Sequence, residues 1–379
     1  KFHYAKNYNS AIHGFESEGY DCRDWDDIHV PAHIQLEGYD IPQYANTQYP
    51  WEGHEEIGPG EIPTHFNPVA SYVKYFEVPE RMKGRRLFIS FQGAESGLAL
   101  WLNGQFVGYS EDTFTPSEFE LTDFLKEGED QDLYRFSGIY RDVYLYTVRD
   151  VHIRDLRIRA LPDASLTKGT LEICAETWGE GKAVFTLTNG NVSFEGEWNL
   201  ADGKYTMEIA NPVLWSAEDP QLYDLYIEVY DAEGVLQEVI PEKVGFRRFE
   251  MKDSIMTLNG KRIVFKGVNR HEFSSVTGRH VSEEELVKDL VTMKQNNINA
   301  IRTCHYPDAS PLYRLCDEYG LYLIDETNLE SHGSWDTVEG TGDYSGVVPH
   351  DKPEWLDMML DRANSMYQRD KNHPAILIW

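Results

Sequence analysis

The chain has 379 residues, with 35 basic and 64 acidic side chains and a formal net charge of −29 at pH 7. A surface this acidic repels phosphate backbones and anionic lipids, which argues against nucleic-acid and membrane partners. The length allows two or three domains, each with its own core. The sequence has no signal-peptide pattern and no long apolar stretch, although it begins with Lys rather than Met.

Cysteine usage predicts a reducing compartment. The four cysteines, at positions 22, 174, 304 and 316, are far apart and do not form the spacing of a disulfide framework. We therefore expect a cytoplasmic protein.

Residues 1–148 are predicted to be all-β. Short alternating stretches, such as 87–91 and 99–102, are separated by Gly and Pro. Asn103-Gly104 lies between two apolar stretches and is typical of a two-residue hairpin. The pattern favours a jelly-roll β-sandwich.

Residues 149–247 are predicted to form a second, smaller sandwich. The stretch 224–230 alternates between apolar and polar residues, and a turn follows at 231–234. A length of about 100 residues is typical of an immunoglobulin-like β-sandwich.

From residue 248 to 379 the hydrophobic period changes from 2 to 3.6. Apolar stretches at 263–268, 300–304, 321–324 and 375–379 predict four strands. Helices between them give the order of the first half of a (β/α)8 TIM barrel. Half a barrel leaves open strand edges, so we expect this chain to be unstable alone and the natural protein to continue.

Three helices are predicted between these strands. The first begins at a capping box that starts at Ser282, the second has Ser310 as N-cap with Pro311 at N1 and ends at Gly320, and the third opens at 351–354. The third is expected to bury its apolar residues, which are Leu356, Met359, Leu360, Ala363 and Met366.

Polar residues follow the predicted strands at the ends where a barrel builds its active site. His271 follows the first strand, His305 the second, and Glu330 and His332 the third. The two histidines are expected to converge and donate hydrogen bonds to a substrate hydroxyl. Glu330 and His332, two residues apart on extended chain, are expected to face the same side and to share a divalent cation or hydrogen-bond each other. Mg²⁺ prefers oxygen ligands, so one imidazole would be unusual but allowed.

Other charged residues near these ends have two interpretations. Arg270 and Arg302 could hold catalytic carboxylates in place or form structural ion pairs. Asp325 and Glu326 could be catalytic carboxylates or buried partners of those arginines, and we favour the second interpretation.

Several longer motifs identify a resemblance that covers nearly the whole chain. They include 267–272 (Gly-Val-Asn-Arg-His-Glu), 305–307 (His-Tyr-Pro), 44–50 (Tyr-Ala-Asn-Thr-Gln-Tyr-Pro), 130–139, 214–218 and 369–374 (Arg-Asp-Lys-Asn-His-Pro). In this order they resemble the large bacterial β-galactosidases of glycoside hydrolase family 2.

The resemblance implies a retaining glycoside hydrolase that cleaves terminal β-D-galactosides, such as lactose, by double displacement. His271 and His305 match histidines that hold galactose hydroxyls and stabilise the transition state. Asn46 and Asp132 match residues that reach the sugar from the first domain. Glu330 and His332 match Mg²⁺ ligands, and Asp132 also matches a Na⁺ ligand. The resemblance also implies a homo-oligomer.

Two departures from the family pattern matter. The family continues the strand that matches 375–379 into Ser-Leu-Gly-Asn-Glu, whose Glu is the acid/base, and the nucleophilic Glu comes later. Because retention needs both carboxyl groups, the chain alone is expected to be inactive. In addition, a strand rich in Val and Trp is expected between Gly128 and Glu129 and is missing here.

Two alternatives stay open. One is another family 2 glycosidase, such as a β-glucuronidase, although the 269–272 and 130–132 segments favour galactose. The other is a non-catalytic carbohydrate-binding fragment, which the missing carboxylates and the β-rich first domains suggest.

Overall fold

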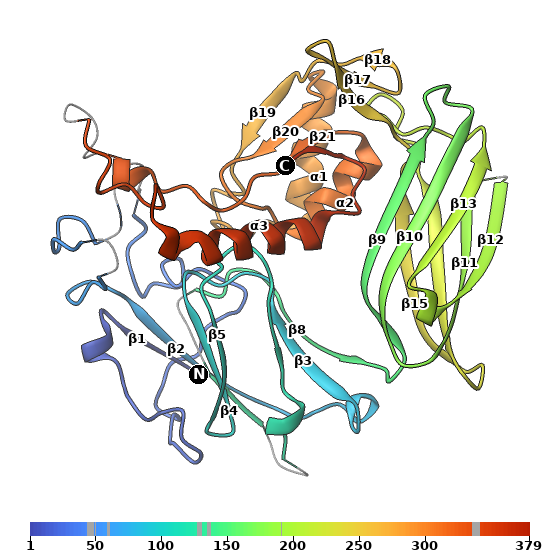
Figure 1. Ribbon diagram of the computed structural model, residues 1–379. Helices are drawn as coiled ribbons and strands as arrows, with labels where there is room; N and C mark the ends of the chain where they lie inside the picture. The colour runs from blue at the N-terminus through green and yellow to red at the C-terminus, as the bar shows by residue number, and fades with distance from the viewer. Residues whose placement is uncertain are drawn as a thin grey trace.

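The computed structural model describes residues 1–43, 49, 51–58, 61–126, 131–134, 138–190, 192–335 and 342–379, with the side chains of 131–134 left out. Figure 1 shows a blue-to-cyan β-domain and a green β-domain, with an orange-to-red α/β-domain beside both. Among the residues described, no helix has the length and apolar character needed to cross a membrane.

The first domain is a β-sandwich, as predicted. Its sheets have the orders β1-β2-β7-β4-β5 and β6-β3-β8. The strands are β1 Phe2–Ala5, β2 Val69–Phe76, β3 Arg86–Phe91, β4 Leu98–Leu102, β5 Gln105–Ser110, β6 Ser117–Glu120, β7 Gln131–Tyr134 and β8 Val143–Val148. Every second residue of β3 from Leu87 is buried, because alternate side chains of a strand face the core. The predicted hairpin is confirmed: Asn103 and Gly104 have φ values of 51° and 79° and join β4 to β5.

The second domain is the predicted immunoglobulin-like sandwich. Its sheets have the orders β13-β10-β9 and β12-β11-β14-β15. The strands are β9 His152–Pro162, β10 Lys168–Trp178, β11 Gly181–Asn189, β12 Val192–Asn199, β13 Lys204–Ala210, β14 Tyr223–Asp231 and β15 Leu236–Val244. Leu225, Ile227 and Val229 of β14 are buried, while the residues between them are more exposed. The alternation that predicted the strand therefore marks its core face.

The third domain contains the four parallel strands of the predicted half barrel, in the order β19-β20-β21-β22. A small antiparallel sheet of β16 Phe249–Lys252, β17 Ile255–Leu258 and β18 Lys261–Arg262 precedes β19 Gly267–Arg270, β20 Ala300–Thr303, β21 Tyr322–Ile324 and β22 Ile376–Ile378. The first barrel strand was predicted too early. The Ile263 amide still donates to the Met256 carbonyl, and parallel pairing begins only where Gly267 meets Ala300.

Two helices cover this sheet as predicted, with one difference in capping. The capping box of α1 (Glu283–Gln295) is present, with Ser282 as N-cap. Helix α2 (Ser310–Tyr319) ends at Gly320, whose φ is 74°. Its N-cap is Ala309, not Ser310, and the Ala309 amide donates to a carboxylate oxygen of Glu272 at 2.8 Å. A carboxylate from the segment that follows β19, rather than a side chain of the helix, therefore accepts a hydrogen bond at the N-terminus of α2.

The third helix, α3 (Leu356–Asp370), follows a 3-10 turn at Pro353–Trp355. Met366 is buried, but Leu356 is 52% and Leu360 is 58% exposed. The prediction that both leucines are buried is wrong. The 3.6-residue period of apolar side chains predicts that a helix has an apolar face, but not which element packs against it. Among the described residues, the first half of the apolar face of α3 is exposed.

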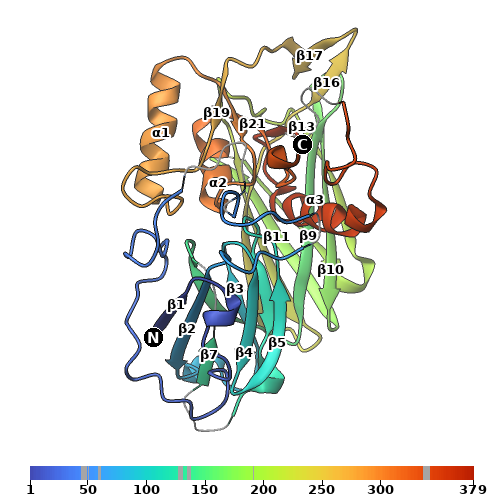
Figure 2. The ribbon, with the colours of Figure 1, turned by 90° about the vertical axis from the view of Figure 1, so that its left-hand side faces the viewer.

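The second domain is attached to the third through the segment 369–374. The Asn372 amide group accepts from the Ile158 amide at 2.8 Å and donates to the Leu156 carbonyl at 2.9 Å. His373 Nδ1 lies 2.6 Å from the buried carboxylate of Asp317. From the second domain, the Trp215 indole donates to the Asp317 carbonyl at 2.9 Å. The contacts of Asn372 and Trp215, one residue from each domain, attach the second domain to the barrel. Figure 2 shows β9 and β10 of the second domain beside α3.

The first domain is attached to the third by a buried ion pair. Arg141 and Glu272 have side chains that are 6% and 1% exposed, and the guanidinium donates to the carboxylate. Arg141 also donates to the carbonyls of Phe114, in its own domain, and Pro307, which follows β20. One side chain thus connects the first domain to the segments after two neighbouring barrel strands.

Replacing Arg141 with Met should lower the free energy of unfolding by roughly 3–5 kcal/mol, because the substitution leaves the Glu272 carboxylate buried without a partner. Denaturant unfolding of the complete protein with and without the substitution measures this. Lys182→Met is the matched control: its 3.0 Å pair with Glu197 is largely exposed, so the loss should stay below about 1 kcal/mol. Equal losses in the two variants would contradict the account.

Candidate functional site

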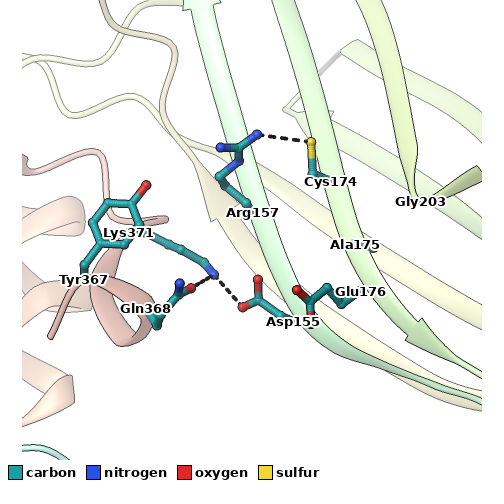
Figure 3. A pocket seen from close by; sticks show the side chains of 9 residues that line it. All are labelled: Asp155, Arg157, Cys174, Ala175, Glu176, Gly203, Tyr367, Gln368 and Lys371. Carbon is teal, nitrogen blue, oxygen red and sulfur yellow. Dashed lines mark hydrogen bonds and ion pairs between the residues drawn. The ribbon is translucent and has the colours of Figure 1, made fainter. Parts of the chain in front are cut away.

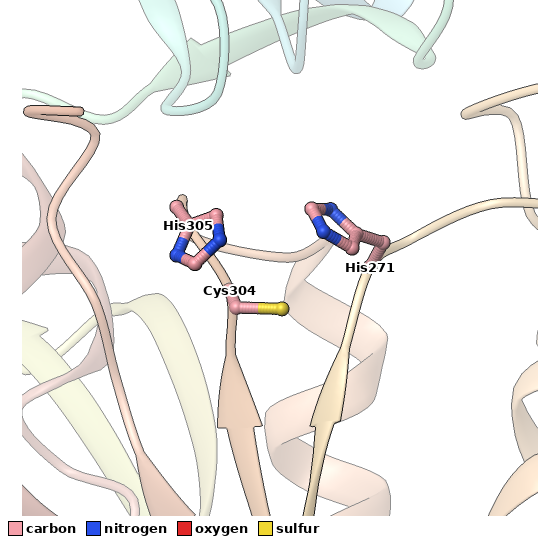
Figure 4. A group of neighbouring side chains, drawn as sticks. All are labelled: His271, Cys304 and His305. Carbon is pink, nitrogen blue, oxygen red and sulfur yellow. The ribbon is translucent and has the colours of Figure 1, made fainter. Parts of the chain in front are cut away.

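The site forms where the parallel strands of the third domain end. His271 follows β19 directly, Cys304 and His305 follow β20, and Asp325 and Glu326 follow β21. Figure 1 shows that the ends of β19 and β20 are directed toward the first domain, and Figure 4 shows backbone of that domain on the side of the two histidines that faces away from the strands. The carboxyl ends of parallel strands share one edge, so these side chains meet there.

The two predicted histidines converge. The rings of His271 and His305 have centroids 5.4 Å apart and are inclined by 79°. Nδ1 of His271 lies 3.3 Å from the hydroxyl of Tyr306, whose ring stacks on Phe114 of the first domain at 4.0 Å. The first domain thereby supports the residue that orients His271.

Glu330 connects His305 to His332. One carboxylate oxygen lies 3.2 Å from Nδ1 of His305, and the other lies 3.5 Å from Nδ1 of His332. The structure thus brings together four residues that were predicted from the sequence. A partly exposed carboxylate oxygen beside an imidazole nitrogen fits two ligands of a Mg²⁺ ion, which usually keeps several waters.

The charged residues near these ends are mostly in ion pairs. Arg302 contacts Glu326 at 2.6 Å, as the favoured interpretation predicted. Arg270 instead pairs with Asp308 at 2.7 Å and with Asp289 at 3.1 Å.

Asp325 departs from that interpretation. It is 1% exposed and accepts hydrogen bonds from the hydroxyls of Thr303 and Tyr313 rather than pairing with either arginine. Burial raises its pKa to about 7. Its neighbours leave it no access to a substrate, so it supports the strand ends.

Three residues that shape the site were not predicted, namely Glu272, Arg279 and Arg141. Glu272 accepts from Arg141 and from the Ala309 amide. Arg279 lies over the rings of Phe114 and Tyr306 and pairs with Glu95 of the first domain at 3.0 Å. Only the position of Glu272, one residue after His271, is a local sequence signal, because the partners of Arg279 and Arg141 are far away in the chain.

Two predicted site residues cannot be compared. Asn46 lies outside the described residues, and so does the side chain of Asp132, whose backbone belongs to β7. The strand expected between Gly128 and Glu129 also falls outside them, at residues 127–130.

His271 is held neutral by its surroundings. Partial burial lowers its pKa, and the neighbouring His305 and Arg279 lower it further, while Glu330 raises it. Because the folded-state pKa lies below the ordinary imidazole value, this histidine stabilises the fold above that value, and the contribution is lost as the pH falls through the folded pKa. A neutral imidazole can donate one hydrogen bond and accept another.

The pKa of His271 should respond to its two neighbours in opposite directions. His305→Gln should raise it, because His305 lowers the pKa of His271, whereas Glu330→Gln should lower it, because the Glu330 carboxylate raises that pKa. NMR titration of the imidazole resonances in both variants measures the shifts. Movement in the same direction in both would contradict this electrostatic description.

A separate pocket of ≈ 370 Å³ lies between the second domain and α3. Figure 3 shows its lining residues, among them Lys371 bonded to Asp155 and Gln368. Among the described residues, those predicted for the site do not line this pocket. The strand ends therefore remain the candidate site.

All three domains match models of one family. The model "Glycosyl hydrolases family 2, sugar binding domain" matches residues 11–131, "Glycosyl hydrolases family 2" matches 151–247, and "Glycosyl hydrolases family 2, TIM barrel domain" matches 249–379. A β-glycosidase structure from Bacteroides vulgatus superposes with a TM-score of 0.76 at 24% identity, covering 100% of this chain and 49% of that one. This likeness concerns the fold.

Curated relatives are similar over the whole chain. A protein from Halalkalibacterium halodurans named beta-galactosidase is 52% identical, and one of the same name from Streptococcus thermophilus is 48% identical. Each alignment covers 100% of this chain but 40% and 39% of the respective relative, so the chain spans about 40% of their length. The first alignment extends over 404 positions, more than the 379 residues here, so that relative has residues without a counterpart. With three matching domain models in the same order and this identity, the chain belongs to glycosyl hydrolase family 2.

Proposed function

We propose that the protein containing this chain hydrolyses terminal β-D-galactosides, such as lactose, and that this chain supplies the platform that holds the sugar. The observation that carries the proposal is the convergence of His271, His305 and Glu330 at neighbouring strand ends. The names of the curated relatives support the choice of galactoside.

In this proposal the two imidazoles bind sugar hydroxyls. His271, held neutral and oriented by Tyr306, donates or accepts a hydrogen bond at one hydroxyl. His305, held between Arg302 and Glu330, binds a second. Such donors are most effective when they strengthen as charge develops in the transition state.

The remaining proposed contacts follow the family resemblance. Asn46 and Asp132 reach the sugar from the first domain, and Asp132 also binds Na⁺. Glu330 and His332 bind Mg²⁺, for which their adjacent donor atoms are suited. When bound, that ion would supply positive charge that stabilises negative charge developing in the reaction.

A neutral sugar fits this site better than a glucuronide. The carboxylates of Glu326 and Glu330 lie beside His305. The nearby guanidinium of Arg302 is already paired with Glu326. Arg302 is therefore not available to pair with a glucuronide carboxylate. This charge arrangement favours the β-galactosidase over the β-glucuronidase alternative.

We propose double displacement with retention, which requires two carboxyl groups about 5–5.5 Å apart on either side of the glycosidic bond. Three carboxylates close to the end of β21 are otherwise engaged: Asp325 is buried, Glu326 is paired with Arg302, and Glu330 contacts two histidines. By the family resemblance, the acid/base and the nucleophile come from segments that follow the strand matching 375–379, and on this proposal the chain alone should be inactive. A homo-oligomer and a cytoplasmic location remain predictions.

The complete protein encoded by the open reading frame should hydrolyse nitrophenyl β-galactoside much faster than nitrophenyl β-glucuronide, because the site is proposed to bind a neutral sugar. Initial rates at equal substrate concentration measure the ratio. Faster turnover of the glucuronide would overturn the galactoside assignment, and no hydrolysis of either would favour the non-catalytic alternative.

In the same protein, His305→Phe should lower kcat/KM for the galactoside by roughly 10²–10³-fold, because it removes a donor that acts in the transition state. The matched control is His29→Phe, since the His29 side chain is 91% exposed in the first domain. Retention of full activity by the His305 variant would remove the proposed role.

A further inference from the structure

Cys304 is a third potential ligand at the strand ends, and the proposed function does not use it. Figure 4 shows its sulfur and the rings of His271 and His305 directed toward the same space. One potential ligand atom from each of the three residues lies within 4.8 Å of the others. The cluster joins β19 and β20 and contains neither member of the Glu330–His332 pair.

The donor set is suited to a thiophilic cation. A thiolate and two imidazole nitrogens are typical zinc ligands, whereas Mg²⁺ prefers oxygen. With bonds of about 2.0–2.3 Å, a tetrahedral ion would hold its donor atoms roughly 3.3–3.8 Å apart. The three groups therefore need to approach by about 1.5 Å at most. Cys304 is 2% exposed and fixed, but His271 is exposed and His305 is half-buried, so the rings can make this adjustment.

A metal-bound histidine usually has a hydrogen-bonding partner at its other ring nitrogen, and both imidazoles already have such a partner at Nδ1. Nδ1 of His271 lies 3.3 Å from the Tyr306 hydroxyl, and Nδ1 of His305 lies 3.2 Å from a carboxylate oxygen of Glu330. Nδ1 of His305 also lies 3.1 Å from the Arg302 guanidinium, which can only donate. In the tautomer in which Nδ1–H of His305 donates to Glu330 instead, and Nδ1–H of His271 donates to Tyr306, Nε2 of each ring is available for a ligand. Such partners fix the tautomer and increase the basicity of the coordinating nitrogen.

The charges nearby also permit a bound cation. Two arginines act on the cluster, and each is paired with a carboxylate: Arg302 with Glu326 at 2.6 Å and Arg279 with Glu95 at 3.0 Å. Glu330 adds a negative charge 3.2 Å from His305. The neighbouring carboxylates therefore offset the positive charge of the arginines, so this charge does not exclude a bound cation.

We propose that His271, Cys304 and His305 form a binding site for a thiophilic divalent cation such as Zn²⁺ or Cd²⁺, separate from the Mg²⁺ ligands. The Cys304 thiol gives its proton to the solvent as the metal–sulfur bond forms, and no electron is transferred. A water molecule completes the fourth position.

This site has a consequence that rests on the proposed function. The imidazoles that would bind the cation are those proposed to bind the sugar. A bound Zn²⁺ ion should therefore inhibit hydrolysis competitively with the galactoside.

Titration of the complete protein with Co²⁺ in excess Mg²⁺ tests the site directly. A stoichiometric thiolate-to-cobalt charge-transfer band is expected, and Zn²⁺ should displace it while further Mg²⁺ should not. This experiment needs no variant. A Co²⁺ spectrum without the thiolate band would overturn the proposal.

The variant Cys304→Ser tests whether Cys304 provides the sulfur ligand. The variant should lose the band and bind Zn²⁺ at least about 100-fold more weakly, a larger loss than is typical for an outer partner. Cys174→Ser, which changes a half-buried cysteine of the second domain, should leave both unchanged. Unchanged Zn²⁺ affinity in the Cys304 variant would refute the site.

If the band appears but Zn²⁺ does not compete with the galactoside, the metal site is supported and the proposed binding of the sugar by the two histidines is contradicted.

Discussion

The arrangement of the candidate site depends on the carboxylate of Glu272. One oxygen accepts from Arg141 of the first domain, and the other accepts from the Ala309 amide at the start of α2. Glu272 follows His271 directly, and Ala309 follows the turn that carries His305. A buried carboxylate must keep both partners, because removing one leaves an uncompensated charge. This constraint fixes both histidine segments relative to each other and to the first domain, and it explains why a β-sandwich belongs to a site built by barrel strands.

Much of the fold could be predicted from the sequence because its signals are local. The Asn103–Gly104 turn, the Ser282 capping box and the Gly320 helix end each depend on residues within one turn of the chain. The strand ends that carry His271 and His305 were predictable for the same reason, since polar residues follow apolar stretches directly. Parallel topology then brings them together.

What could not be predicted depends on contacts between distant segments. Arg141 meets a carboxylate 131 residues away, and no feature of its own neighbourhood marks it as buried. The cap of α2 was assigned to Ser310 because the Glu272 carboxylate that replaces a capping side chain lies on another strand end. Leu356 and Leu360 were predicted to be buried because periodicity identifies a face and not its partner.

The most direct test of the account is a crystal structure of the complete protein with galactose bound. The account predicts the sugar at the ends of β19 and β20, with hydroxyls within hydrogen-bonding distance of His271 and His305 and with the Arg141–Glu272 pair intact. Galactose bound only elsewhere, such as in the pocket between the second domain and α3, would contradict the assignment of the strand ends as the sugar site.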